Sequence, residues 1–99
     1  MRTIHKFPLP AGTWEYEIQM PRNADILCVQ MQREMPCIWA AVDDSARMEP
    51  RRVVIVGTGW ELPADMGRSE YVGTFQTDVD YVWHVFAAKP NALGERNVA

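Results

Sequence analysis

Hydrophobic and polar residues alternate with a period of two along most of this chain. Side chains of a β-strand point alternately to opposite faces, so this pattern predicts half-buried strands. The clearest case is residues 14–20, where apolar and polar positions alternate without a fault: Trp14, Tyr16, Ile18 and Met20 against Glu15, Glu17 and Gln19. We expect an antiparallel strand there with one wet face.

Residues 25–43 predict a hairpin whose turn covers residues 33–36. Pro36 supports this turn, because proline cannot donate to a strand ladder. The register pairs Gln32 with Cys37, Gln30 with Trp39, and Cys28 with Ala41. One face is then apolar and is expected to be core: Leu27, Val29, Met31, Ile38, Ala40 and Val42. The other face is mixed: Ile26, Cys28, Gln30, Gln32, Cys37, Trp39 and Ala41.

A second hairpin is predicted from residues 69–77 and 80–87, with its turn at residues 78–79. Its register pairs Phe75 with Val82, Gly73 with His84, and Tyr71 with Phe86. One face is Tyr71, Gly73, Phe75, Val82, His84 and Phe86. The other is Val72, Thr74, Gln76, Tyr81, Trp83 and Val85.

The remaining segments complete an all-β pattern. Residues 2–7 predict a short edge strand ended by prolines, and residues 51–57 a strand covered on both faces, because Val53 to Val56 are all apolar. Residues 45–50 and 60–67 are expected to be loops. About seven short, mainly antiparallel strands favour a small sandwich or a partly open barrel. We expect one all-β domain over residues 1–89 and a flexible tail over residues 90–99.

Charge and hydropathy exclude several classes of function. The net charge of −3 and pI near 5.3 argue against a general nucleic-acid binder. No stretch approaches the roughly 20 apolar residues of a membrane span, and no leader precedes the first strand. We expect no membrane partner and a cytoplasmic location.

The two cysteines share a face of the first hairpin but stand four residues apart in the predicted register. That separation is about 13 Å, beyond the reach of a disulfide, so free thiols are expected. Without a CxxC motif or a nearby pair of histidines, they predict no zinc site.

Candidate catalytic chemistry is sparse. The Gly57-Thr58-Gly59 step lacks the rest of a phosphate-binding motif, and a turn or bulge explains it better. His84 faces Gly73 in the predicted register and is expected to cover it, with no Ser, Cys or carboxylate placed beside it. We expect no metal, no cofactor and no catalytic residues.

The surface that remains is rich in aromatic and amide side chains. If both hairpins belong to one sheet with these faces on the same side, they form one continuous binding surface: Gln30, Gln32, Trp39, Gln76, Tyr81 and Trp83. Such a composition is typical of interface hot spots and of platforms that stack on flat ligands. A solvent-exposed face with a tolerated Trp, or the lining of a closed barrel, remains an alternative.

Several segments resemble a family of small proteins of unknown function found mainly in bacteriophages, prophages and their hosts. The resemblance covers roughly residues 2–88 and is carried by residues 3–9, 36–43, 55–59, 71–76 and 83–86. It implies a phage or bacterial origin and an intracellular setting, and it supplies no site residues.

These observations favour a non-catalytic phage or bacterial accessory protein that binds through the Trp/Gln/Tyr face. Covering that face by self-association predicts a homo-oligomer, at least a dimer. A small nucleotide-like molecule is one expected ligand. The alternatives are an inhibitor or structural module that docks on a host or virion protein, and a small enzyme around His84.

Overall fold

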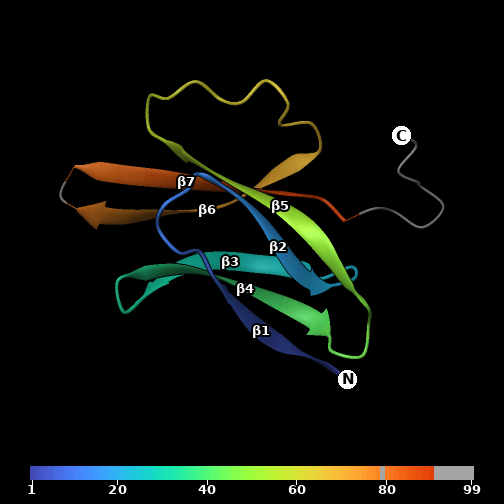
Figure 1. Ribbon diagram of the computed structural model, residues 1–99. Helices are drawn as coiled ribbons and strands as arrows, with labels where there is room; N and C mark the ends of the chain where they lie inside the picture. The colour runs from blue at the N-terminus through green and yellow to red at the C-terminus, as the bar shows by residue number, and fades with distance from the viewer. Residues whose placement is uncertain (79, 91–99) are drawn as a thin grey trace.

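Strands account for all of the regular structure in the computed structural model, which describes residues 1–78 and 80–90 (Figure 1). The described part contains seven strands and no helix, as the alternation predicted. Their bounds are β1 (Arg2–Pro8), β2 (Glu15–Pro21), β3 (Asp25–Gln32), β4 (Met35–Asp43), β5 (Met48–Gly57), β6 (Ser69–Asp78) and β7 (Tyr81–Ala88). The tail expected at residues 90–99 lies outside the described residues from residue 91 on.

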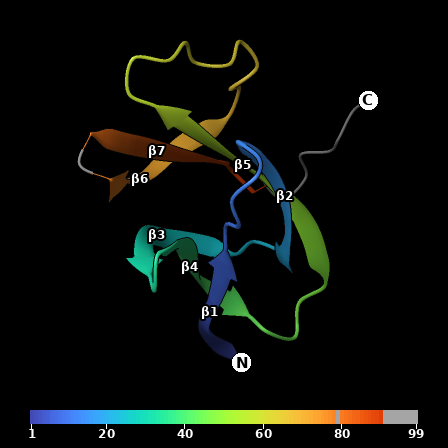
Figure 2. The same ribbon diagram turned by 60° about the vertical axis from the view of Figure 1, so that its left-hand side comes forward.

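The strands form two antiparallel sheets that pack as layers, and the sheets do not close into a barrel. One sheet has the order β1-β4-β3, and the other has the order β2-β5-β7-β6. Figure 2 shows the two layers apart, with the chain between β1 and β2 crossing from one to the other. The fold is therefore a small β-sandwich.

The core lies between the two layers and draws on both. Its main cluster contains Val29 and Ile38 from one sheet, together with Val53, Ile55, Phe75, Val85 and Ala87 from the other. Leu9, in the crossing segment, joins them and is held by a backbone bond of 2.9 Å from its N–H to the Pro36 carbonyl. As predicted, β5 is buried on both faces from Val53 to Val56.

The first hairpin has the predicted strands but a different register. Its turn contains only Arg33 and Glu34, both with positive φ, so Gln32 pairs with Met35 and Gln30 pairs with Cys37. A shift of two residues keeps every side chain on its face. A bulge at Leu27 then exchanges the faces, which leaves Leu27 50% exposed and turns Ile26 toward the core.

The second hairpin departs further from its predicted register. Tyr71 pairs with Phe86 as expected, but bulges after Tyr71 and after Gln76 place Phe75 opposite Trp83 and His84 opposite Thr74. Trp83 packs against the core, on the same face of β7 as the buried Val85, so the expectation that it lies on an outer binding face is wrong. His84 does not cover Gly73.

The two hairpins belong to different sheets, which removes the condition for one continuous Trp/Gln/Tyr surface. The predicted loop at residues 45–50 is also shorter, because β5 begins at Met48.

Both cysteines are free, as expected. They are nevertheless diagonal neighbours, since Cys28 pairs with Trp39 and Cys37 with Gln30, so the predicted separation of about 13 Å is too large.

Candidate binding site

Three tryptophans and a tyrosine gather at the end of the four-stranded sheet where β2 begins and β5 ends. Trp14 lies just before β2, and its carbonyl accepts a 2.8 Å bond from the Ile55 N–H, which fixes it beside β5. Trp83 lies on β7 opposite Gly57 and donates its indole N–H to Thr77 Oγ1 at 2.9 Å. Tyr81 stands two residues earlier on the same face of β7. We call Trp14, Trp60, Trp83 and Tyr81 the aromatic cluster.

Trp60 reaches this cluster through the Gly57-Thr58-Gly59 turn. The turn is closed by a 3.0 Å bond from the Trp60 N–H to the Gly57 carbonyl, and Gly59 has a φ of +88°. The indole folds back over Gly57 so closely that a Cβ there would stand 2.8 Å from Trp60 Cε2. The glycine at position 57 is therefore a packing requirement, and the turn positions an aromatic ring.

The rings of the aromatic cluster have two orientations. Trp14 stacks on Trp83 with centroids 4.8 Å apart and an interplanar angle of 22°, and Tyr81 stacks on Trp83 at 6.1 Å and 14°. Trp60 stands at 90° to Trp14 and at 81° to Trp83. Three nearly parallel rings thus form a short stack, and the fourth ring meets the stack edge-on.

This cluster is unusually exposed for large aromatic residues. Trp14 is 51% exposed, Trp60 47% and Tyr81 58%, although Trp83 is half-buried. A cavity of about 240 Å³ opens beside Trp14 and Trp83 and reaches the core residues Leu9, Ile55 and Phe75. A second cavity of about 230 Å³ lies along Trp60, Tyr81 and Trp83. The rings therefore form the walls of two adjoining hollows.

Polar contacts hold the segments that carry the cluster. Arg52 donates from Nε to Glu15 at 2.6 Å and from Nη1 to the Asp65 carbonyl at 2.9 Å, which ties the start of β2 to the loop after Trp60. Tyr16, in the wall of the first cavity, donates to the Pro10 carbonyl at 2.7 Å. Burial raises the pKa of Tyr16 above its ordinary value, which favours the protonated hydroxyl that makes this bond.

The residues predicted to bind from sequence fall into three places. Tyr81 and Trp83 belong to the aromatic cluster. Trp39, Gln30 and Gln32 share the outer face of the three-stranded sheet, where Gln32 accepts a 2.7 Å bond from Lys6 Nζ. Gln76 lies on the opposite side of its sheet from Trp83, beside Val82. Only the first two come together with the two tryptophans that the pattern missed.

The pattern did not predict that Trp14 and Trp60 meet, because each follows a glycine-containing turn and their contact depends on how those turns fold. Trp14 was assigned to the half-buried side of a strand, but β2 begins one residue later. A tryptophan beside a glycine-containing turn could have indicated this site, because a large apolar side chain in a loop tends to pack on a neighbouring surface.

His84 lies in a chain of hydroxyl groups on the outer face of the four-stranded sheet. Its Nε2 is 2.7 Å from Thr58 Oγ1, and its Nδ1 is 3.0 Å from Thr74 Oγ1, which in turn contacts the Tyr71 hydroxyl. Both ring nitrogens are thus occupied by neutral partners. Among the described residues, no carboxylate or thiol bonds to the ring to orient it for acid–base catalysis.

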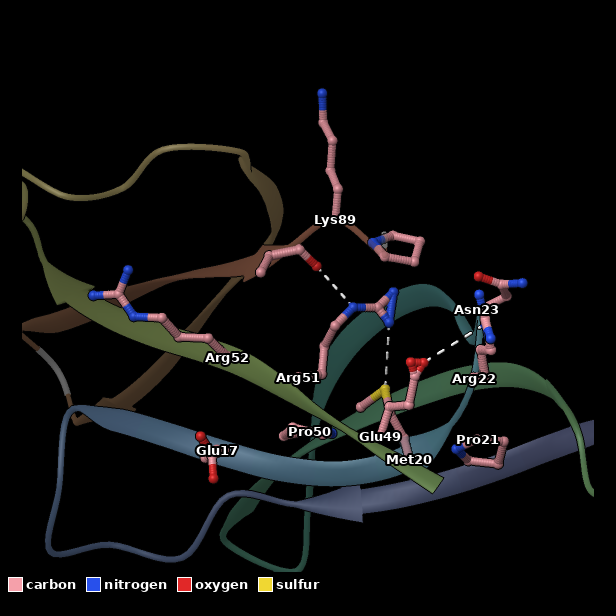
Figure 3. A pocket seen from close by; sticks show the side chains of 12 residues that line it. Glu17, Met20, Pro21, Arg22, Asn23, Glu49, Pro50, Arg51, Arg52 and Lys89 are labelled. Carbon is pink, nitrogen blue, oxygen red and sulfur yellow. Dashed lines mark hydrogen bonds and ion pairs between the residues drawn. The ribbon is translucent and has the colours of Figure 1, made fainter. Parts of the chain in front are cut away.

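A charged cavity of about 270 Å³ lies at the other end of the four-stranded sheet, with Arg51 beside it (Figure 3). Arg51 is only 8% exposed. Its guanidinium donates to the Ala88 carbonyl at 2.8 Å and to the Ala24 carbonyl at 2.7 and 3.1 Å. Burial lowers the pKa of Arg51, while the carboxylates of Asp25, Glu49 and Glu70 act in the opposite direction. This cation holds backbone segments together, so its cavity is a weaker candidate site.

Residues 1–78 and 80–90 include no helix long and apolar enough to cross a membrane. Within the same ranges, no group of three or more His, Cys, Asp or Glu side chains could hold a metal ion.

The sequence profile of DUF7352, described as a domain of unknown function, matches residues 1–95, so the chain belongs to that family. No curated protein and no solved structure shows significant similarity to the chain. The expectation of a domain-of-unknown-function family is confirmed.

Proposed function

We propose that this member of the DUF7352 family is a non-catalytic binding protein whose ligand stacks on the aromatic cluster. The observation that carries the proposal is the short stack of Trp14, Trp83 and Tyr81, which ends in exposed rings beside two cavities. A flat ligand placed on Trp14 or Tyr81 would continue the stack.

Energetics favour a binding role over simple closure of the sandwich. A tryptophan contributes most to stability when its large apolar surface leaves water, yet Trp14 and Trp60 each keep about half of theirs in solvent. Clustered exposed aromatic residues are typical of binding sites. A ligand that covered these rings would remove from water the apolar surface that folding leaves exposed, and this burial would favour binding.

The proposed ligand has a planar ring and no need of a phosphate group. Stacking a base on an aromatic side chain contributes about 1–3 kcal/mol, which suits the base of a nucleotide-like molecule. No Lys or Arg is among the residues that line the two cavities, so no cationic side chain there would attract a phosphate group. The base, rather than the phosphate, would carry the recognition, and the protein would act by sequestering its ligand.

The test uses adenosine as an uncharged probe and AMP as its phosphorylated partner. The chain has four tryptophans and therefore four indole N–H signals in a ¹H–¹⁵N spectrum. Adenosine should shift the signals of Trp14, Trp60 and Trp83 but not that of Trp39, which lies on the other sheet. AMP should bind no more tightly than adenosine.

Two variants sharpen this test against a matched control. Trp14→Ala should weaken adenosine binding about tenfold, the size expected when one stacking ring is lost. Gly57→Ala should also weaken it, because the added methyl displaces the Trp60 indole. Trp39→Ala should leave binding unchanged. Equal shifts at all four indoles, or unchanged binding by Trp14→Ala, would contradict the proposal.

Self-association is a second candidate role, favoured by the outer face of the three-stranded sheet. Ile4 pairs with Ala41 on that face and is 58% exposed, and half-buried Trp39 lies beside Lys6 one pair further along. A sheet face that mixes apolar and polar side chains in this way suits a homodimer or docking on a host or virion protein.

The setting that accompanies both roles is the cytoplasm of a bacterial cell that carries a phage or prophage. Sequestration of a host molecule by a small accessory protein needs no catalytic residues. The absence of a carboxylate or thiol partner for His84 among the described residues makes an enzyme the least supported alternative.

A further inference from the structure

Charged side chains around the aromatic cluster are mainly acidic. Among the residues that line its two cavities, Glu34 and Asp80 are charged, and both are carboxylates. Glu61 follows Trp60 directly and is exposed. Arg52 stands near the cluster because it forms an ion pair with Glu15. It is also paired with Asp65, so two carboxylates already balance its positive charge.

The rings themselves attract positive charge. The face of an aromatic ring is electron-rich, and tryptophan is the best of the side chains that bind cations in this way. Because Trp60 stands nearly perpendicular to Trp14 and Trp83, the cluster presents ring faces in two directions. Recognition of quaternary ammonium groups by several aromatic side chains is a known use of this attraction.

We propose that the aromatic cluster selects a small organic cation of the quaternary ammonium class. This inference rests on the proposed function, because both need ring faces that are open to a ligand, and it adds a preference for a positively charged group at the same rings. The rings supply the contact area, and the carboxylates of Glu34 and Asp80 supply the charge complementarity. A cationic group avoids the repulsion that these carboxylates and the overall net charge of −3 would impose on an anion.

The test compares choline with 3,3-dimethylbutan-1-ol, an uncharged alcohol of the same shape, at constant ionic strength. Both titrations are followed by the four indole N–H signals, with Trp39 as the internal control. Choline should shift the signals of Trp14, Trp60 and Trp83 at about two- to fivefold lower concentration than the alcohol, as expected for cation–π attraction at an exposed site.

Charge variants measure how much of the preference for choline depends on the two carboxylates. Glu34→Gln combined with Asp80→Asn should reduce the advantage of choline over the alcohol. Glu17→Gln is the matched control, because Glu17 is exposed on β2 and lines the charged cavity at the other end of the sheet. It should leave the ratio unchanged.

The outcomes separate this inference from the function on which it rests. If adenosine shifts the cluster and choline binds no better than the alcohol, the cation preference is wrong and the stacking function stands. If neither adenosine, choline nor the alcohol shifts the cluster selectively, both are wrong. An advantage of choline that is undiminished in the double carboxylate variant would overturn the assigned role of Glu34 and Asp80.

Discussion

Gly73 allows the two sheets to approach each other where β3 faces β6. A Cβ at this position would stand 2.8 Å from Val29 Cγ1, well inside normal contact distance. Branching at Cβ restricts the rotamers of valine, so Val29 cannot easily turn away. The glycine thus serves packing between the sheets, not the cross-strand contact with His84 that the sequence had favoured.

Gly73→Ala should lower the free energy of unfolding by about 1–3 kcal/mol, the usual cost of overpacking a core. Urea denaturation would measure it. The double variant Gly73→Ala with Val29→Ala provides the control, because removing the two Val29 methyl groups makes room for the new one. The two changes should therefore cost less together than the sum of the single variants. Strict additivity would show that Gly73 and Val29 do not compete for space.

The sequence predicts the burial of single residues correctly where the pattern of apolar and polar positions is unbroken. Val53 to Val56, Ile38, Ala40 and Val42 are buried as predicted, because uninterrupted alternation or an apolar run leaves one choice of face. Trp14 and Trp60 were not predicted to meet, since their contact depends on how two turns fold. Tyr81 and Trp83 were named as binding residues, but on a surface that does not exist.

At the scale of elements, all seven strands were predictable and their registers were not. Alternation reports which face a residue takes, and it is unchanged when a register slips by two, as it does between Gln32 and Met35. A bulge adds one residue to one strand only, so the bulges at Leu27 and beside Gly73 leave no trace in the pattern. Each bulge displaced a set of predicted partners.

Arg51 joins three elements through one side chain. It stands on β5 and donates to Ala24, just before β3, and to Ala88 at the end of β7. Lysine keeps the charge but cannot reproduce the planar fork that makes these bonds. Arg51→Lys should therefore lower the free energy of unfolding by about 2–4 kcal/mol, because it leaves buried carbonyls unpaired.

The control for Arg51 is its neighbour in the same cavity. Arg22 lies half-exposed with its Nε 3.7 Å from Glu49 Oε1, so Arg22→Lys should change stability by less than about 1 kcal/mol. Chemical denaturation of both variants would compare them. A similar small loss in both would show that the bonds made by Arg51 carry little of the stability.

At the scale of the whole molecule, the division into two sheets decides what can bind where. The sequence indicated two hairpins rich in aromatic residues, but nothing in their pattern says whether they share a sheet. Because the two hairpins lie in different sheets, Trp39 is on the outer face of one sheet and the aromatic cluster is at one end of the other. One predicted surface thus becomes two independent ones, and their roles can be tested apart.

Self-association through the three-stranded sheet is the prediction that belongs to this scale. The wild-type protein should be at least a dimer by light scattering, because burying Ile4 and Trp39 in a two-fold interface removes exposed apolar surface from water. Ile4→Lys and Trp39→Ala should shift it toward monomer while leaving the melting temperature of the fold nearly unchanged, since neither residue is part of the core clusters. Trp14→Ala should leave the assembly intact, and Trp83→Glu should lower stability because Trp83 packs on the core. A monomeric wild type would remove the dimer proposal, and dissociation by Trp14→Ala alone would move the interface to the aromatic cluster.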